Sequence, residues 1–277
     1  MPFRDRGPNA LLHICYRWKL FERYKLQKGR LPPETLIKEA LVENVLNDVA
    51  ILPLLAYPLY KLLTCGGRKR KSAARDSAAT DGDDDNDDGE GWSRLRFGAR
   101  LPSWGTMAWQ VFGAYLGYDF MFYWTHRLIH QKDLYLKVHK QHHRFRTSIG
   151  IASSYQHPVE GAIQMLNWFV PLGVVGWLNG GLHISVVFSY NVLRWIETVD
   201  AHCGYSFPWS PFTFIPLFGG ALAHDFHHSG EGLQMRKLKD GTLFADFGNY
   251  GATVIWDRLM GTESPAYRRL RAAAKKV

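Results

Sequence analysis

Residues 126–130 read HRLIH, residues 139–143 read HKQHH and residues 224–228 read HDFHH. These three clusters hold eight of the twelve histidines of this 277-residue chain. Residues three and four apart share one face of a helix, so each cluster can direct two or three imidazoles at one point. Neutral imidazole is the commonest protein ligand for iron, zinc and copper. Because eight imidazoles are too many for one ion, the pattern predicts a site for two metal ions.

The histidine spacing excludes several other metal chemistries. The HExxH motif of zinc proteases is absent, and no paired cysteines and histidines of a zinc finger occur. A redox metal pair that activates dioxygen for attack on an unreactive C–H bond is therefore favoured. The chain contains no GxGxxG dinucleotide motif after a strand and no haem-binding module, so a partner must supply the electrons.

Composition favours a membrane over a nucleic acid as the surface that this chain contacts. The net charge is +9 and aromatic residues make up 14% of the chain. A mean hydropathy of −0.22 requires any membrane spans to alternate with large polar segments. Basic charge suits either nucleic acid or an anionic membrane, but no nucleic-acid-binding motif is present. We therefore expect a membrane partner and no nucleic acid.

The cysteine content and the start of the chain bear on the compartment. Cys15, Cys65 and Cys203 are too few for a disulfide framework and form no CxxC pair, which fits a reducing compartment. The first residues lack an apolar run followed by a small-residue cleavage site, so we expect no secretory signal. Internal segments must then supply any membrane insertion.

The first hundred residues divide into three segments. Residues 1–38 are basic and aromatic, which is typical of an interfacial helix or of an ordinary amphipathic surface helix. Residues 41–64 are long enough to cross a bilayer, although they carry polar residues and two prolines. Residues 66–100 contain a basic patch and an acidic run and are expected to be a solvated linker. The acidic run has Asn86 where a calcium loop requires glycine, which excludes that site.

Three further apolar segments, at 104–125, 161–178 and 182–196, complete the predicted membrane part. The last two are joined by Asn179-Gly-Gly181 and form a hairpin, and 41–125 forms a second pair of crossings. All histidine clusters then lie on one side of the membrane, and the basic residues beside them mark that side as cytosolic. The predicted boundaries are 1–38 for the interfacial segment, 39–65 for the first span, 66–100 for the linker, 101–265 for the catalytic domain and 266–277 for a basic tail.

Acidic residues near the clusters can orient the metal ligands. Metal-bound histidines usually donate their second N–H to a carboxylate or a carbonyl. The candidates for this role, each of which could equally be a solvated or salt-bridged carboxylate, are Asp119, Glu160, Glu197, Asp200, Asp225 and Asp257. His157 and His202 stand outside the clusters, and by composition alone such single histidines are more often structural than ligands.

The three clusters resemble the histidine boxes of the fatty acid hydroxylase superfamily, whose members include sterol desaturases and methylsterol oxidases. The segments SSYQHPVEG, ETVDAHCGYSFPWSP and NYGATVIWDRLMGTE are similar to its connecting and closing signatures. The segment ERYKLQKGRLPP is similar to the region before the first span in the sterol-oxidising branch. The resemblance covers residues 20–265, and the three boxes in this order are highly specific for the superfamily.

The resemblance implies an all-α integral membrane protein of the endoplasmic reticulum. Its expected fold has about four transmembrane helices in two hairpins under a cytosolic helical cap that holds two metal ions. The metals would be iron, with zinc possible in a purified form, and the enzyme would use dioxygen and electrons from NAD(P)H through cytochrome b5 or its reductase. The metal ligands carried over by position are His126, His130, His139, His142, His143, His202, His224, His227 and His228. His157 matches a family histidine that is either a ligand or a neighbour of the ligands.

Within the superfamily the chain resembles sterol C-4 methyl oxidases most, through HKQHHR, HPVE and the DxHxGYxFPW pattern from Asp200. Sterol 25-hydroxylase is the nearest rival, and C-5 sterol desaturase, fatty acid or sphingolipid hydroxylases and enzymes acting on an aldehyde are further alternatives. A non-catalytic membrane protein that holds structural metal is the alternative from another class. Two departures from the family pattern are the acidic run at 81–90 and an insertion at 229–248, and neither the exact lipid nor the oligomeric state follows from the sequence.

Overall fold

We analysed the protein in a computed structural model. The structure describes residues 14–16, 18–47, 49, 53–54, 57, 95–96, 100–230, 234–237 and 243–274. Beyond residue 47, the predicted first span lies outside the described residues, except at positions 49, 53, 54 and 57. The predicted linker, with its acidic run, also lies outside them except at residues 95, 96 and 100.

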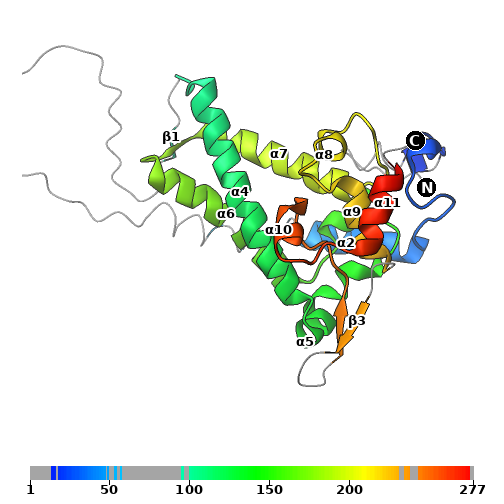
Figure 1. The fold of residues 1–277 in the computed structure, drawn as a ribbon. Helices are drawn as coiled ribbons and strands as arrows, with labels where there is room; N and C mark the ends of the chain where they lie inside the picture. Colours follow the sequence, from blue (N-terminus) through cyan, green and yellow to red (C-terminus); the bar gives the residue numbers. More distant parts are fainter. Residues whose placement is uncertain are drawn as a thin grey trace, which may run out of the picture.

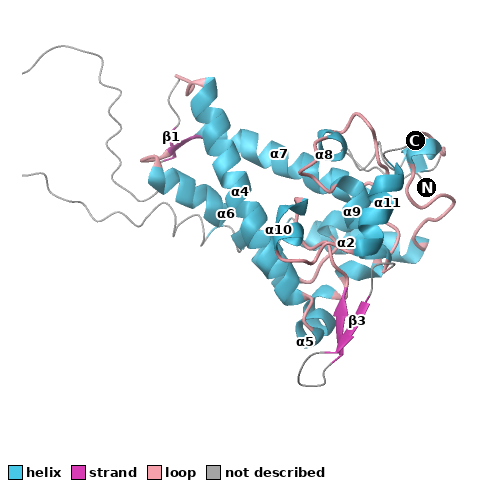
Figure 2. Ribbon diagram, viewed as in Figure 1, coloured by secondary structure: helices cyan, strands magenta, loops and turns pink. Residues whose placement is uncertain are grey.

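Three long helices form the frame of the described chain (Figures 1 and 2). They are α4 (Trp104–Ile129), α6 (Pro158–Leu178) and α7 (Ile184–His202). Helix α4 packs against both α6 and α7 through a core that includes Ala114, Leu172, Val186 and Tyr190. A tight turn joins the end of α6 to the start of α7. The two helices meet at this corner of the frame and diverge from it toward the histidine clusters. The predicted hairpin of residues 161–196 is therefore present as two helices.

Side chains fix where two of these helices begin. The Ser103 hydroxyl accepts a hydrogen bond from the backbone N–H of Thr106, at 3.1 Å, before α4. The His183 Nδ1 accepts one from the N–H of Ser185, also at 3.1 Å, before α7. Just ahead of α7, strand β2 (Leu182–His183) pairs in parallel with β1 (Leu95–Arg96). The caps satisfy backbone donors that the first helical turns leave free.

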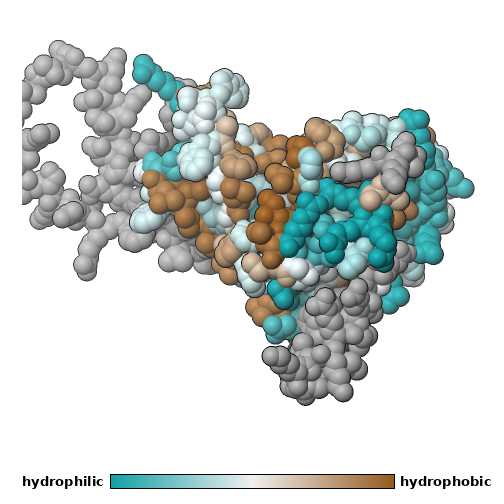
Figure 3. Space-filling view, in the orientation of Figure 1, coloured by the Kyte–Doolittle hydropathy of each residue, from teal (hydrophilic) through white to brown (hydrophobic). Residues whose placement is uncertain are grey.

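The outer face of the frame is apolar. On α4, Trp109, Phe112, Leu116, Phe120 and Trp124 are between 41% and 62% exposed and recur at helical spacing. Figure 3 shows hydrophobic side chains gathered over this part of the molecule. Apolar patches of this extent mark membrane or protein contacts. Among the described residues, α6 is the helix whose length and hydropathy suffice to cross a membrane. The mostly helical fold is confirmed, and the number of crossings stays a prediction.

Short elements at one end of the frame make up the cap. Helix α5 is followed by a single π-helical turn, η3, and then by two 3-10 turns, η4 and η5. The cap elements are η1 (Glu22–Tyr24), α2 (Glu34–Leu46), α5 (Lys132–Leu134), η3 (Tyr135–His139), η4 (His142–Arg144), η5 (Gly150–Ser154), α8 (Pro211–Phe214), α9 (Gly220–Ser229), α10 (Val254–Leu259) and α11 (Pro265–Ala274).

Helix α2 runs across the segment boundary expected at residue 38. It begins after Pro33, and its residues Leu36 and Ala40 pack against the loop and turn around Phe145 and Ile151. The amide Nδ2 of Asn44 donates to the carbonyl of Ile151 at 2.9 Å. This polar residue of the predicted first span therefore faces protein, as an intramembrane polar residue must face protein or water.

Two segments have more structure than their composition predicts. The predicted basic tail begins at 266, yet helix α11 covers Pro265–Ala274 and buries Tyr267 fully against Phe226 of α9. The insertion at 229–248 contains an antiparallel hairpin of β3 (Gln234–Lys237) and β4 (Leu243–Asp246). An arginine also holds α11 on the cap, because Arg271 donates hydrogen bonds to the carbonyls of Pro216 and Phe218 at 3.0 and 2.9 Å.

The close contact between α4 and α6 gives a stability prediction. A Cβ atom added at Gly117 would lie 2.8 Å from the Cβ of Pro171, whereas one added at Gly113 would lie 3.6 Å from Val175. We expect Gly117→Ala to destabilise the protein by about 1–3 kcal/mol through overpacking. Gly113→Ala should be neutral or stabilise by about 0.5–1 kcal/mol, because alanine favours a helix over glycine. Thermal unfolding in detergent measures both, and equal midpoints for the two variants would contradict the packing.

Candidate metal centre

Nine buried or half-buried histidines converge in two neighbouring groups at the cap end of the frame. Within each group the ligand atoms lie within 4.8 Å of one another. The first group is His126, His130, His139, His143 and His227, and the second is His142, His202, His224 and His228. These are the nine residues that the family resemblance assigns as ligands. The structure therefore offers two adjacent places for a metal ion, with five and four imidazoles.

The expectation that each cluster points at one place is wrong for two of the three clusters. Histidines four apart do share a group, as His139 with His143 and His224 with His228. The histidine three residues after the first belongs to the other group in each case, namely His142 and His227. In an α-helix, a side chain four positions further on points about 40° beyond one full turn. A side chain three positions further on points about 60° short of one full turn. The two directions diverge enough to serve two ions.

The second cluster is not α-helical. His139 ends the π-helical turn η3, and His142 and His143 lie in the 3-10 turn η4. Turns of unequal pitch alter the direction of successive side chains, and π-helical turns often occur at functional sites. Its three histidines divide between the two groups in the same way as those of the third cluster, which lie in the α-helix α9.

Hydrogen bonds to the Nδ1 atoms show which ring nitrogen is left for a metal. Nδ1 of His126 lies 2.8 Å from the Tyr250 carbonyl, and that of His139 lies 2.8 Å from Oε1 of Glu160. Nδ1 of His142, His202 and His227 likewise lies 2.7 to 3.1 Å from the carbonyls of Tyr155, Thr198 and Gly248. An acceptor at Nδ1 requires the proton to sit there, so the Nε2 of each of these five rings carries a lone pair.

The lone pairs face one another. The Nε2 atoms of His126 and His139 are 3.2 Å apart, and those of His142 and His202 are 3.4 Å apart. All four of these rings use their proton at Nδ1, so no proton is available between the paired Nε2 atoms. Two acceptors at this distance repel unless a cation lies between them. The donor set of the two groups therefore fits two metal ions.

Burial keeps the cap histidines neutral. It lowers the pKa of His142 and of His227 to about 4 and holds the pKa of His139, His143 and His224 well below the ordinary value. Removal of the charged form from water is the largest cause in each case. Neutral imidazole is the form that binds a metal, so the site is in its binding form near neutral pH.

Of the acidic candidates, Glu160 hydrogen-bonds directly to a histidine of the groups, namely His139. Asp257 acts on a histidine of the groups indirectly. It accepts hydrogen bonds from the N–H groups of Tyr250 and Gly251, at 2.9 and 2.8 Å, and so fixes the loop whose Tyr250 carbonyl meets His126.

The other acidic candidates bind elements of the frame and cap. Asp119 accepts from the N–H of Thr253 at 2.9 Å, and Asp200 accepts from the hydroxyl of Ser210 at 2.7 Å. Glu197 accepts from the Tyr115 hydroxyl at 3.1 Å and pairs with Arg194. Asp225 accepts from Gln27 at 3.0 Å. His157 lies in neither group; its Nδ1 caps α6 by accepting from the N–H of Val159.

Sequence reasoning missed the backbone acceptors. The carbonyls of Tyr155, Thr198, Gly248 and Tyr250 orient four of the nine rings, and every residue type carries such a carbonyl. One weak signal exists at Gly248, whose φ is +65° and where a Cβ would lie 2.8 Å from the carbonyl oxygen of Thr262. Only glycine fits there, so Gly248, 20 residues after the third box, is the weak signal in the sequence for this carbonyl acceptor.

A cavity of about 550 Å³ lies against both groups, between α4, α6 and α7. His126 and His139 of the first group and His142, His202 and His224 of the second line its inner end. Apolar and aromatic side chains make up much of its remaining wall, including Tyr118, Phe122, Met165, Trp168, Phe169 and Trp195. Cavities of this size and lining hold small apolar ligands. A lipid in this cavity would contact both metal positions.

The lowered histidine pKa values predict a pH dependence. In the chelator-treated protein, folded His142 and His227 take up protons only near pH 4, whereas their unfolded forms take them up below about 6.5. Unfolding then binds protons between these values, so stability should fall as the pH drops from about 6.5 to about 4. Thermal unfolding in detergent at pH 7.5 and 5 measures this. A double His142→Gln, His227→Gln variant should show a weaker pH dependence, and an equally steep one would contradict the assignment.

Comparisons with known proteins agree with this geometry. The family model for fatty acid hydroxylases matches residues 111–262, a region that contains all nine histidines. A methylsterol monooxygenase of Arabidopsis thaliana is 40% identical over 178 residues, 64% of this chain and 60% of the relative. A very-long-chain aldehyde decarbonylase of Oryza sativa is 33% identical over 264 residues, 94% of this chain and 81% of the relative.

A methylsterol monooxygenase of Gallus gallus is 34% identical over 165 residues, 59% of this chain and 49% of the relative. The chain thus spans about half to three fifths of the length of these methylsterol monooxygenases. No solved structure matches the chain. The family match covers more than half of the sequence, and the three histidine boxes lie in the order expected from it. The chain belongs to the fatty acid hydroxylase family.

Proposed function

We propose that this chain is a membrane-bound non-haem di-iron monooxygenase that oxidises a sterol, and that its target is a methyl group at C-4. The observation that carries the proposal is the pair of histidine groups at the inner end of an apolar cavity. Two iron ions held there would supply activation of dioxygen for attack on an unreactive C–H bond. The relatives named as methylsterol monooxygenases support the choice of substrate.

The chain's own residues position the reactants. Five Nδ1 hydrogen bonds fix the orientation of the ligand rings before any metal binds, which lowers the cost of assembling the site. Aromatic side chains such as Phe122 and Trp168 hold the lipid and exclude water from the reacting carbon. The cavity is lined by residues of α4, α6 and α7, the three helices of the apolar frame.

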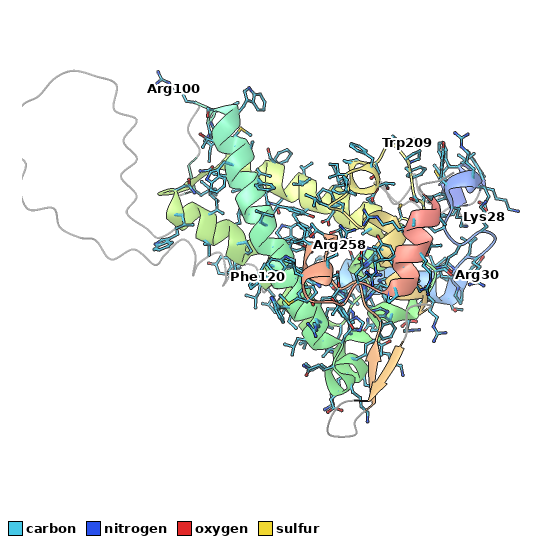
Figure 4. The ribbon with its side chains drawn as sticks, in the orientation of Figure 1. Lys28, Arg30, Arg100, Phe120, Trp209 and Arg258 are labelled. Atoms are coloured by element: carbon cyan, nitrogen blue, oxygen red, sulfur yellow. The ribbon has the colours of Figure 1, made fainter. Side chains whose placement is uncertain are left out.

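Charge and hydropathy support a membrane position with the cap in the cytosol of an endoplasmic reticulum membrane. Lys28, Arg30 and Arg258 project from the cap, whereas the outer face of α4 around Phe120 is apolar (Figure 4). Basic residues concentrate on cytosolic faces of membrane proteins. A basic face also suits an acidic electron carrier, which we propose to be cytochrome b5 or its reductase with NAD(P)H as the electron source.

A second candidate reaction acts on a very-long-chain aldehyde. The decarbonylase relative aligns with 94% of this chain, including the region before the family match. A long aldehyde would use the same metal pair and the same cavity. Sterol 25-hydroxylation, C-5 desaturation and hydroxylation of fatty acids or sphingolipids share the site in the same way. A purely structural metal is disfavoured, because the cavity leaves both groups open to a ligand.

Metal content tests the ligand assignment. We expect the purified protein to hold two irons, and His228→Ala to hold about one, because this change removes one of four imidazoles from the second group. His157→Ala is the matched control, since His157 caps a helix outside both groups, and it should keep two irons. Iron per protein by mass spectrometry gives the count. Equal losses in both variants would contradict the division into two groups.

A sterol profile tests the substrate. Cells that lack this gene should accumulate 4-methyl or 4,4-dimethyl sterols, and the intact chain should reverse the accumulation. His142→Ala should fail to do so, because it removes a ligand of the second group, whereas His183→Ala should succeed, because His183 caps α7. An unchanged sterol profile with altered aldehydes or hydroxylated lipids would reject the sterol assignment and favour the second candidate.

A further inference from the structure

We propose that a basic groove on the cap, floored by helix α9, is the docking site of an acidic protein that carries one electron. The inference rests on the proposed function and deepens it, since it says where electrons for the metal pair enter the protein. The groove has a volume of about 710 Å³ and lies between the segment around η1, the loop before α8, helix α9 and helix α11. None of the described residues that line it lines the cavity assigned to the lipid.

Helix α9 presents one face to the groove and the opposite face to the lipid cavity. Its groove-lining residues recur at the spacing of one helical face and are Leu222, Asp225, Phe226 and Ser229. Its cavity-lining residues are Gly220, Ala223 and His224. The two sets are offset by two residues, which is a rotation of about 200° around the helix. A carrier can therefore dock in the groove while a lipid occupies the cavity.

The floor of the groove lies one helix away from the second histidine group. Asp225 directly follows His224 in the chain, and Ser229 directly follows His228. An α-helix with its side chains is about 10–12 Å in diameter, so a carrier in the groove is separated from the second metal position by about this thickness. Electron tunnelling weakens steeply with distance and is faster along covalent bonds. The groove is therefore a short route for electrons to the metal pair.

Hydrogen bonds fix the wall of the groove that the N-terminal segment forms. The Gln27 amide donates to both carboxylate oxygens of Asp225, at 3.0 and 3.1 Å. The backbone N–H of Leu26 donates to the carbonyl of Gly204 at 3.0 Å. The wall is thus attached both to α9 and to the loop before α8. A docking surface that is already formed lowers the cost of ordering when a partner binds.

The described lining of the groove carries three cations and one carboxylate. The cations are Arg23 and Lys25 of the N-terminal segment and Arg271 of α11, and the carboxylate is Asp225. The Arg23 side chain is exposed, and its guanidinium lies 4.4 Å from the ring centroid of Tyr24. Complementary charge speeds the encounter of two proteins and orients them. The groove therefore favours an acidic partner.

Two further cations extend the basic surface beyond the groove. Lys28 and Arg30 follow the wall segment in the chain, are exposed and project from the cap (Figure 4). Charges at the rim of an interface act mainly on the rate of association and on its salt dependence. A carrier that must arrive, deliver its electron and leave requires such a rim.

The proposed reaction fixes how many electrons must pass through the groove. Conversion of one C–H bond to an alcohol uses one dioxygen, two electrons and two protons, and gives the alcohol and one water. Two reduced carriers therefore dock in turn, and each is oxidised by one electron. Electron-transfer encounters of this kind use small interfaces, which a single groove with a basic rim suits.

A second basic groove on the cap does not meet these conditions. It lies beside α10 and α11 and contains Arg258 and Arg268. The Nε atoms of these arginines lie 3.3 and 3.8 Å from carboxylate oxygens of Glu263, so their charge is already partly paired. Neither α10 nor α11 carries any of the nine histidines. This groove is therefore not one helix away from a metal position.

Binding of a carrier tests the groove without turnover. The probe is the haem domain of cytochrome b5, and its Kd is measured on the iron-loaded full-length protein in nanodiscs of zwitterionic lipid. Arg23→Glu should raise the Kd about tenfold, because like-charge repulsion replaces attraction. Arg23→Lys keeps the charge and should keep the wild-type Kd. Lys132→Glu is the matched control, because Lys132 is exposed on α5, away from α11 (Figure 1), and it should also keep the wild-type Kd.

Three outcomes would overturn the inference. The first is an equal Kd for Arg23→Glu and Lys132→Glu. The second is an effect of Arg23→Glu that appears only in nanodiscs containing phosphatidylserine, which would assign the groove to lipid headgroups. The third is an equal loss of binding in Arg23→Lys and Arg23→Glu, which would mean that the shape of the side chain matters and its charge does not. Added salt should weaken wild-type binding more than that of Arg23→Glu.

Electrons supplied without the carrier distinguish failure of the inference from failure of the proposed reaction. Protein reduced with dithionite and freed of excess reductant should oxidise a 4-methylsterol in one turnover, with equal yield in wild type and Arg23→Glu. If reduced wild type gives no product, the proposed reaction is wrong, and the Kd values still judge the inference. A lower yield in reduced Arg23→Glu would mean that Arg23 acts on the metal centre itself, which overturns the inference.

Discussion

The structure depends on the burial of nine neutral imidazoles with their lone pairs directed at two points. Between rings such as His126 and His139, or His142 and His202, a bound cation would offset the repulsion between the Nε2 atoms. For five of the nine rings the surrounding elements supply a carbonyl or a carboxylate at Nδ1. Three of the nine histidines lie in the irregular turns η3 and η4 of the cap, where π-helical geometry often marks a functional site.

The frame and the cap are coupled through the metal centre. Helix α4 delivers His126 and His130 from one side and α7 delivers His202 from another, while both present apolar residues outward. Helices α4, α6 and α7 together line the cavity beside the two histidine groups. A cavity for a lipid favours apolar surroundings, whereas a nitrogen-rich metal site favours polar ones. Here apolar side chains and histidines of both groups line one cavity.

Much of the candidate site could be predicted from the sequence, because metal binding requires particular side chains at helical spacing. The three boxes and the single His202 are the nine residues of the two groups, and the mostly helical fold follows from the same patterns. The resemblance to the fatty acid hydroxylase superfamily is confirmed by the family match. Composition did not predict the docking of α11, because the contact between Tyr267 and Phe226 forms only in the folded chain.

The sequence by itself determined which residue types are available to bind metal, because only histidine, cysteine and carboxylate side chains supply such ligands. It also determined that long apolar helices flank them. Tertiary structure decided which histidines of different clusters combine at each of the two positions, because this depends on how α4, α7, α9 and the turns η3 and η4 pack against one another. It also decided which carbonyls orient the rings, because every residue carries a carbonyl and only folding chooses the partner of each.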